Sequence, residues 1–313
     1  MLDYIAGLLT GLLDIDTRCG VAPELPAAQF LHTRLSEVGA VCAIYEPVPG
    51  RGSVTAVIPG AETSRIVLHA HLDTADVDAT KWQYPPLRAT MSDGRIYGRG
   101  ALDCKGLCAV WTGICGYFMK NRLKPQKTIV FTATADEESG GFLGTKWLCD
   151  NTGIFDRADL VIGEGGGFAV EANGQDYFAI QTGEQSQPGY CNQASLDYMS
   201  APRYGKRRVD PAAFSAAPEG YTENCKMADI IRQIQQTLRR MDRNEVLLPF
   251  SAPGFSDNRH FRELGIPTIG FFPIGMDNSI AGIHGPDEYI NMRSLKMAYE
   301  ILLEIVLDYS MPK

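Results

Sequence analysis

Acidic side chains and a histidine stand directly after apolar, strand-like runs of this sequence. His71 ends the run RIVLHAH, the pair Glu137 and Glu138 follows TIVFTATA, and Glu164 follows a third such run. Because open α/β sheets place their ligands at the carboxyl ends of strands, these side chains are predicted to meet in one site. Imidazole and carboxylate groups are ligands that divalent metals take from proteins. The chemistry predicted for this site is therefore metal-assisted.

Two pairs of neighbouring residues suggest that one member binds metal while the other has a supporting or catalytic role. His71 and Asp73 point to the same side of an extended chain, so Asp73 is able to accept the second imidazole proton and orient the ring. Glu137 and Glu138 are adjacent and therefore diverge, which allows one to bind metal while the other acts as a general base. A capped buried histidine and a solvated acidic turn are the alternatives for the two pairs.

Two further candidates lie in glycine-flanked turns. Asp103 stands in YGRGALDCKG, directly before a predicted helix. Its carboxylate has two oxygens and is able to bridge two ions about 3.5 to 4 Å apart, although a simple helix cap is the alternative. His284 lies in GIHGPDEY, before the last predicted helix. His260 follows SDNR, in a segment that could also reach the site.

The elements that must position these residues alternate between strand and helix. The predicted strands are 41–45, 53–58, 65–71, 128–135, 160–163 and 267–272. The predicted helices are 1–13, 24–38, 102–119, 142–149, 222–241 and 292–309. This alternation predicts an α/β fold, a three-layer sandwich with a mostly parallel mixed sheet flanked by helices. We expect one catalytic domain over residues 1–313.

The segment 184–221 is different in character from the rest of the chain. Gln, Ser, Pro, Gly and Tyr dominate it, and neither helical nor strand periodicity is present. A structureless connection of this length is unusual inside a compact domain. The prediction is an irregular segment without a core of its own.

Composition excludes several classes of protein. The chain has 313 residues and a formal net charge of −8, which argues against a nucleic-acid backbone as partner. Its eight cysteines are scattered and include no CxxC pair, so a disulfide framework is not expected. No apolar run approaches the roughly 18 residues of a membrane span. A cytoplasmic protein is the resulting expectation.

Taken together, the motifs resemble the M20 family of metallopeptidases, which includes deacylases, desuccinylases and carboxypeptidases. The matching blocks occur in family order and cover most of the chain outside 185–221. They are HLDTAD (71–76), WQYPPL with DGRIYGRGALDCKG (82–106), ADEESGG (135–141), GEGGG (163–167), SDNRHFRELGIPTIGF (256–271) and IHGPDEYI (283–290). As a set these blocks are highly specific.

The resemblance implies two divalent metal ions that share one carboxylate, most simply zinc, with cobalt and manganese as the other candidates. The ligands would be His71, Asp103 and Glu164 for one ion, and Asp103, Glu138 and His284 for the other. Glu137 would be the general base and Asp73 the partner of His71. A glutamate at position 164 suits the deacylase and carboxypeptidase members. Arg259 falls in a block that helps to hold the substrate carboxylate, and His260 is its neighbour.

One departure from the family concerns the lid. Family members insert a lid or dimerisation domain of about 100 residues, a small-domain size, where this chain has only 184–221. That lid supplies a histidine to the oxyanion, and no histidine lies between His71 and His260. We therefore expect a monomer, or a dimer that no lid mediates, with an open active site.

The predicted function is hydrolysis of an amide bond in N-acyl amino acids or short peptides by a two-zinc enzyme. The expected partner is a small-molecule or peptide substrate, with no nucleic acid and no membrane. Two alternatives remain open from the sequence. One is a lid-free aminopeptidase that acts on free amino termini, and the other is a zinc-binding protein that has lost catalysis.

Overall fold

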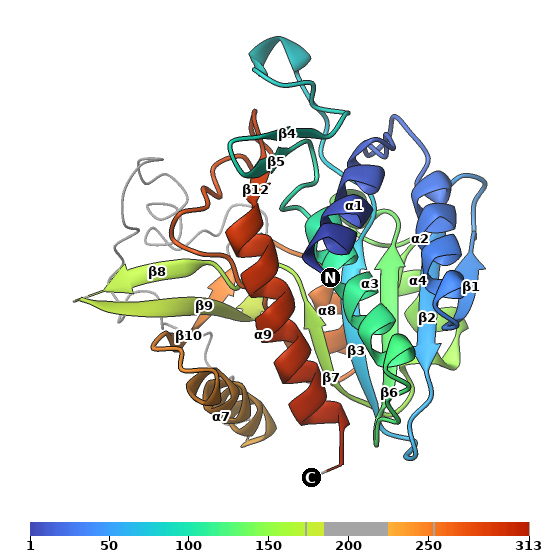
Figure 1. Ribbon diagram of the computed structural model, residues 1–313. Helices are drawn as coiled ribbons and strands as arrows, with labels where there is room; N and C mark the ends of the chain where they lie inside the picture. The colour runs from blue at the N-terminus through green and yellow to red at the C-terminus, as the bar shows by residue number, and fades with distance from the viewer. Residues whose placement is uncertain (173, 185–224, 253, 313) are drawn as a thin grey trace.

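In the part of the chain that the structure describes, a nine-stranded sheet forms the centre, with helices on both faces (Figure 1). The computed structural model describes residues 1–172, 174–184, 225–252 and 254–312. The strands are β1 Val41–Tyr45, β2 Ser53–Ile58, β3 Arg65–His71, β4 Thr90–Ser92, β5 Arg95–Tyr97, β6 Thr128–Thr134, β7 Ala158–Gly163, β8 Ala169–Ala172, β9 Gln175–Glu184, β10 Val246–Ala252, β11 Thr268–Gly270 and β12 Tyr289–Asn291. The α-helices are α1 Leu2–Leu13, α2 Leu25–Glu37, α3 Lys105–Lys120, α4 Thr145–Asn151, α7 Cys225–Arg240, α8 Asn258–Glu263 and α9 Met292–Ser310. Single 3₁₀ turns are η1 Ala79–Lys81, η2 Glu137–Ser139 and η3 Gly153–Phe155.

The strand order of the large sheet is β1-β2-β6-β3-β7-β11-β9-β10, with β8 paired to β9. Its four central strands β6, β3, β7 and β11 run parallel, while β1, β2 and β8 pair antiparallel with their neighbours. His71 at the end of β3 lies opposite Thr134 at the end of β6. The carboxyl ends of the central strands therefore meet at one edge. The prediction of an α/β fold with a mostly parallel mixed sheet flanked by helices is confirmed.

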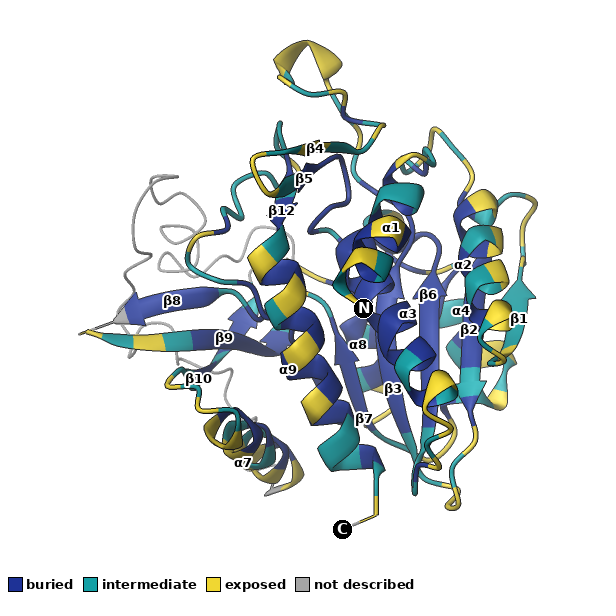
Figure 2. Cartoon of the chain, in the orientation of Figure 1, coloured by how far each residue is buried: buried dark blue, intermediate teal, exposed yellow. Residues whose placement is uncertain are grey.

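Alternation of side chains along the central strands supplies both layers of the core. Ile66 and Leu68 of β3 face the layer built by α1, α2, α3 and α9, whereas Val67 faces the opposite layer. There Val67 packs in a cluster with Phe155 and with Phe261 of α8. Figure 2 shows the central strands buried and the exposed residues on the outer sides of the helices. The runs read as buried strands in the sequence are buried because helices cover both of their faces.

Three short strands form a second sheet, in the order β12-β5-β4. Tyr289 of β12 pairs with Tyr97 of β5, which brings the chain just after His284 beside the chain just before Asp103. These three-residue strands were not predicted from the sequence, and neither were β8, β9 and β10. The predicted helix 142–149 begins at Thr145 instead, because Gly144 directly before it has a non-helical backbone with φ −110° and ψ −103°.

The predicted irregular segment 184–221 lies outside the described residues, apart from Glu184 at the end of β9. Its replacement of a lid therefore stays a prediction, as does the single domain over 1–313. Within the described part of the chain, no helix is long and apolar enough to cross a membrane.

Candidate metal centre

His71 is fixed at the carboxyl end of β3 by the chain that follows it. Its side chain is completely buried, and its Nδ1 donates to the backbone carbonyl of Asp73 at 2.9 Å. The Asp73 carboxylate lies farther from the same nitrogen, at 3.5 Å. The ring therefore presents Nε2 to the site. The closest partner of Nδ1 is the carbonyl oxygen of Asp73, whereas the sequence predicted the Asp73 carboxylate.

The Asp73 carboxylate holds the acidic turn that follows β6. Its two oxygens accept the backbone amides of Glu137 at 3.1 Å and of Glu138 at 3.0 Å. Asp136, directly before the pair, has a left-handed backbone with φ 76° and accepts from the guanidinium of Arg51 at 3.0 Å. This turn places Glu137 and Glu138 at the carboxyl edge of the sheet. The buried Asp73 carboxylate accepts the backbone amides of both residues.

Asp103 stands in a loop organised by a buried acid near the C-terminus. The Glu288 carboxylate accepts the backbone amides of Gly100, Leu102 and Asp103, at 2.9, 2.7 and 3.0 Å. Arg99 donates to the same carboxylate at 2.7 Å and to the carbonyl of Gly285 at 3.0 Å. The loops of Asp103 and His284 are therefore joined by one buried ion pair.

The remaining two candidates, Glu164 and His284, lie on different kinds of backbone structure. Glu164 directly follows β7, and the side-chain amide of Asn258 donates to the backbone carbonyl of Glu164 at 3.0 Å. His284 lies in the loop before β12 with a positive φ of 54°, and its side chain is 56% exposed. Glu164 is thus positioned by the sheet. His284 is positioned by a loop in which the Gly285 carbonyl accepts a hydrogen bond from Arg99.

The ligand atoms meet in two groups around Asp103. On one side, His71 Nε2 lies 2.9 Å from Asp103 Oδ1 and 3.7 Å from Glu164 Oε2. On the other side, His284 Nε2 lies 3.0 Å from Asp103 Oδ2 and 3.2 Å from Glu138 Oε2. The structure thus brings all five predicted ligands together, with the two oxygens of Asp103 facing opposite partners.

Electrostatics indicate that this cluster fits a cation. Burial raises the pKa of Glu164 to about 8 and that of Glu137 well above its usual range. The hydrogen bond to Asp103 raises the pKa of His284 to about 10. One buried oxygen of Glu138, Oε1, has no hydrogen-bond partner. Crowded acids that hold protons, together with an unpartnered carboxylate oxygen, are what divalent metals would compensate, and the oxygen and nitrogen donors suit zinc.

The two residues predicted to contact substrate lie behind the acidic turn. Arg259 Nη2 donates to the carbonyl of Gly140 at 2.6 Å, and His260 Nε2 lies 3.0 Å from the same oxygen. His260 is only 3% exposed, whereas the Arg259 guanidinium lies against the exposed rings of Phe142 and Phe255. In this structure both side chains brace the turn that carries Glu137, and Arg259 also borders the surface.

Two buried acids near the site, Glu288 and Asp257, were not predicted from the sequence. Glu288 is completely buried, and so is Asp257, which accepts from the hydroxyls of Thr134 at 3.1 Å and Thr145 at 2.5 Å. Both residues lie inside motif blocks, which was the one available signal. The buried ion pair of Glu288 with Arg99 depends on a contact across 189 positions, so no local pattern reveals it.

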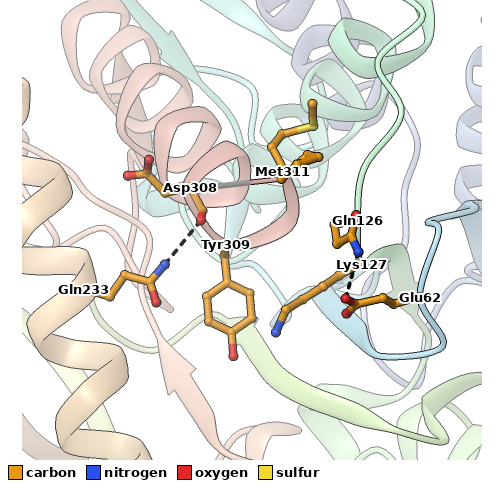
Figure 3. A pocket seen from close by; sticks show the side chains of 8 residues that line it. Glu62, Gln126, Lys127, Gln233, Asp308, Tyr309 and Met311 are labelled. Atoms are coloured by element: carbon orange, nitrogen blue, oxygen red, sulfur yellow. Dashed lines mark hydrogen bonds between the residues drawn. The ribbon is translucent and has the colours of Figure 1, made fainter.

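A hollow of about 410 Å³ lies at the opposite edge of the sheet (Figure 3). Its lining includes Glu62 and Gln126, which precede β3 and β6, and Asp308 near the end of α9. Figure 3 shows Gln126 donating to Glu62 and Gln233 donating to the carbonyl of Asp308. Because it lies at the amino ends of the central strands, this hollow is separate from the metal centre.

Comparison with known sequences matches most of this chain to one family. The sequence profile of peptidase family M20/M25/M40 matches residues 67–308. A probable succinyl-diaminopimelate desuccinylase of Staphylococcus epidermidis is 32% identical over 143 residues, which are 45% of this chain and 35% of the relative. An N-formyl-4-amino-5-aminomethyl-2-methylpyrimidine deformylase of Halalkalibacterium halodurans is 32% identical over 132 residues, 40% of this chain and 30% of the relative. The matches thus span about a third of the length of these curated relatives.

Solved structures share the fold at lower identity. An M20 family metallo-carboxypeptidase of Sulfolobus solfataricus superposes with a TM-score of 0.68 at 15% identity, covering 98% of this chain and 99% of that one. Human carnosine dipeptidase 1 superposes with a TM-score of 0.66 at 13% identity, covering 98% and 97%. At these identities the likeness establishes the fold alone.

Proposed function

We propose that this chain, which belongs to peptidase family M20/M25/M40, is a two-metal hydrolase of amide bonds in N-acyl amino acids or short peptides. The observation that carries the proposal is the arrangement around Asp103. Its two carboxylate oxygens lie 2.9 Å from His71 and 3.0 Å from His284, with Glu164 and Glu138 completing the two groups. One carboxylate between two such groups suits a pair of metal ions.

Metal ions bound there would lower the pKa of a coordinated water and polarise the substrate carbonyl. Glu137 lies beside the first group, with Oε2 at 3.8 Å from His71 Nε2. Its buried carboxyl has a raised pKa, which suits a group that takes a proton from water and returns it to the leaving nitrogen. Asp73 fixes the backbone of Glu137 and so holds the base at a constant position.

The substrate class is drawn from what the named relatives have in common. Desuccinylase, deformylase, carboxypeptidase and dipeptidase are all names for the cleavage of a bond between an acyl carbon and an amine nitrogen. Glu137 supports hydrolysis over simple metal storage, because a storage site needs no acid held beside its ligands. The acyl group is therefore proposed only as small or amino-acid derived.

The test is turnover by the metal-loaded protein. Chain stripped of metal and reloaded with zinc, cobalt or manganese is assayed with N-succinyl, N-acetyl and N-formyl amino acids, with dipeptides, and with amino-acid anilides. Release of free amine from the acyl substrates or dipeptides by loaded protein, absent from stripped protein and from Glu137→Gln, supports the proposal. Turnover of anilides alone would favour an aminopeptidase, and metal binding without any turnover would favour a protein that has lost catalysis.

A further inference from the structure

Arg51 lies between two acids that come from distant parts of the chain. Its Nη2 lies 2.6 Å from Oε1 of Glu24 and 3.0 Å from Oδ1 of Asp136. Glu24 is completely buried at the start of α2, and Asp136 is buried directly before Glu137. One guanidinium group therefore connects the acidic turn of the site to α2, by a hydrogen bond that spans 85 positions.

The backbone that carries Arg51 is held firmly against α2. Arg51 lies in the loop that joins β1 to β2, and Figure 1 shows α2 beside these two strands. The carbonyl of Gly50 accepts the backbone amide of Leu25 at 3.0 Å. A Cβ atom added to Gly52 would lie 2.9 Å from the Cα of Leu25, so loop and helix are in close backbone contact. The Arg51 side chain thus extends from a fixed support.

Asp136, the partner of Arg51, determines how the chain enters the acidic turn. Its backbone is left-handed with φ 76°, a conformation that residues other than glycine adopt rarely. Its carboxylate is held at both oxygens, since Oδ1 accepts from Arg51 and Oδ2 accepts the backbone amide of Leu143 at 2.9 Å. Its carbonyl accepts the amide of Gly141 at 2.6 Å. A change at Asp136 would therefore be passed to Glu137 through the peptide that joins them.

The acidic turn follows β6 and is supported from both neighbours of that strand. Asp73, which follows β3, accepts the backbone amides of Glu137 and Glu138. Arg51 directly precedes the β2 side of the sheet and contacts Asp136. Because β6 lies between β2 and β3, these two supports act on the turn from opposite sides. With the Arg51 contact removed, the turn would be free to pivot about the bonds to Asp73.

We propose that Arg51 is a positioning residue for the two glutamates of the turn. It holds Asp136, and through Asp136 it sets the direction in which Glu137 and Glu138 approach the candidate metal centre. The inference rests on the proposed function, because the roles of base and ligand are proposed there. A misplacement of about 1 Å is able to lower turnover by about 10²-fold. Since Arg51 acts through the turn, its loss should lower kcat and leave KM nearly unchanged.

Replacement of Arg51 is the first test. Arg51→Met removes the charge and keeps an apolar stem, so kcat on an acyl substrate should fall by about 10–100-fold. Zinc affinity of the group that contains Glu138 should fall by about 10–100-fold. Arg51→Lys should retain part of both, because a single nitrogen of Arg51 contacts both acids. The matched control is Arg65→Met, since Arg65 also donates to a turn, at the carbonyls of Gly153 and Ile154, but at the amino end of β3. It should leave kcat and zinc affinity unchanged.

A double-variant cycle tests whether Arg51 acts through Asp136. Asp136→Asn weakens the link to Arg51 and keeps a residue type that tolerates a left-handed backbone. If the two side chains act together, the double variant should lose no more kcat than the more affected single variant. Losses that multiply would mean that Arg51 acts by another route and would overturn the inference.

Rescue by a small ion provides a further readout. The Arg51 side chain is 20% exposed, so the space left by Arg51→Ala is open to solvent. Millimolar guanidinium chloride should restore kcat of Arg51→Ala, and should leave wild type and Glu137→Gln unchanged. Circular dichroism at the same concentration verifies that folding is equal with and without the ion. Absence of rescue in a folded variant would count against the inference.

The outcomes separate this inference from the proposed function. Wild-type turnover with kcat and zinc affinity unchanged in Arg51→Met would overturn the role of Arg51 and leave the proposed function standing. If wild type hydrolyses no substrate, the proposed function fails, and zinc affinity of the Glu138 group alone supports or refutes the positioning role. Arg51→Met leaves the buried Glu24 without a counter-ion, which is destabilising. If that variant does not fold, Asp136→Asn decides, because it keeps Glu24 paired, and an unchanged kcat there overturns the inference.

Discussion

The two halves of the candidate metal centre, one around His71 and Glu164 and one around Glu138 and His284, are built on different kinds of backbone. His71 and Glu164 stand at the ends of β3 and β7, in the rigid middle of the sheet, and His71 is fully buried. Glu138 and His284 stand on a single 3₁₀ turn and on a loop, and the His284 side chain is 56% exposed. The sheet thus fixes one half, while the other half opens to substrate. We expect the buried half to retain its metal more tightly.

Glu137 lies beside the buried half, with Oε2 3.8 Å from His71 Nε2, and its removal should have the largest effect on turnover. Glu137→Gln should lower kcat by about 10²–10⁴-fold, the range for a general base, with both metals retained. The adjacent Glu138→Gln is the matched comparison, because it should lose the metal of the open half. Metal content by mass spectrometry and kcat on one acyl substrate distinguish the two variants. Loss of metal from Glu137→Gln instead would mean that the two roles are reversed.

Substitution of His71 or His284 should weaken the metal affinity of one half while leaving that of the other half unchanged. His284→Ala should weaken one metal by at least about 100-fold, the upper end of the effect of losing a supporting partner, and leave the other bound. His71→Ala should act on the buried half, and His32→Ala on α2 serves as a control. Isothermal titration of each variant with zinc measures the two affinities. Simultaneous loss of both metals from His284→Ala would show that the halves are not independent.

Glu288 should affect both halves at once, because it supports Asp103 directly and the His284 loop through Arg99. Glu288→Gln leaves the buried Arg99 charge without a counter-ion, which is expected to cost about 3–5 kcal/mol of folding free energy. Metal affinity should fall by about 10–100-fold in both halves. Urea unfolding and zinc titration measure the two effects, with the exposed Glu304→Gln as control. An effect confined to one half would contradict the shared support.

The smallest expected effect is on the pH dependence of the metal-free protein. The pKa of Glu164 is raised from 4.5 to about 8, mainly by burial, and that of His284 from 6.5 to about 10, by its hydrogen bonds to Asp103 and Glu138. Both groups bind protons more tightly when folded, so their stabilisation is present at low pH and is lost as pH rises. Glu164 acts between pH 4.5 and about 8, and His284 between pH 6.5 and about 10.

Thermal melts of metal-stripped protein should therefore show Tm falling as pH rises across these windows. Glu164→Gln should flatten the lower window and His284→Ala the upper one. Saturating zinc should reverse the trend, because metal binding requires deprotonated ligands. A Tm of stripped protein that rises between pH 6 and 8 would contradict the assignment of these protons.

The sequence predicted the central strands well because burial on both faces leaves a strong apolar signal. The bounds of β3 were predicted residue for residue, and those of β6 to within one residue at its end. The small sheet of β4, β5 and β12 escaped prediction because strands of three residues have too few side chains to show a period. Local pattern was sufficient where helices cover both faces of the sheet, and insufficient where distant loops pair.

The same distinction holds within the candidate site. The sequence could propose ligand-type residues because each stands at a strand end or beside glycine. It could not show that the Asp73 carboxylate holds two backbone amides, or that Arg259 and His260 both contact the carbonyl of Gly140. Those contacts depend on tertiary geometry. The roles of Arg259 and His260 toward substrate stay predictions.

We expect the contact between Glu288 and the Asp103 loop to determine when the candidate site takes shape during synthesis. Residue 288 leaves the ribosome 185 residues after Asp103, whose amide it accepts. A nascent chain that has reached the end of β7 already carries His71 and Asp103, but neither His284 nor the acid that shapes the Asp103 turn. Non-local contacts of this kind form late in folding. Nascent chains are thus expected to acquire their metals only once the C-terminal segment has been made and has docked.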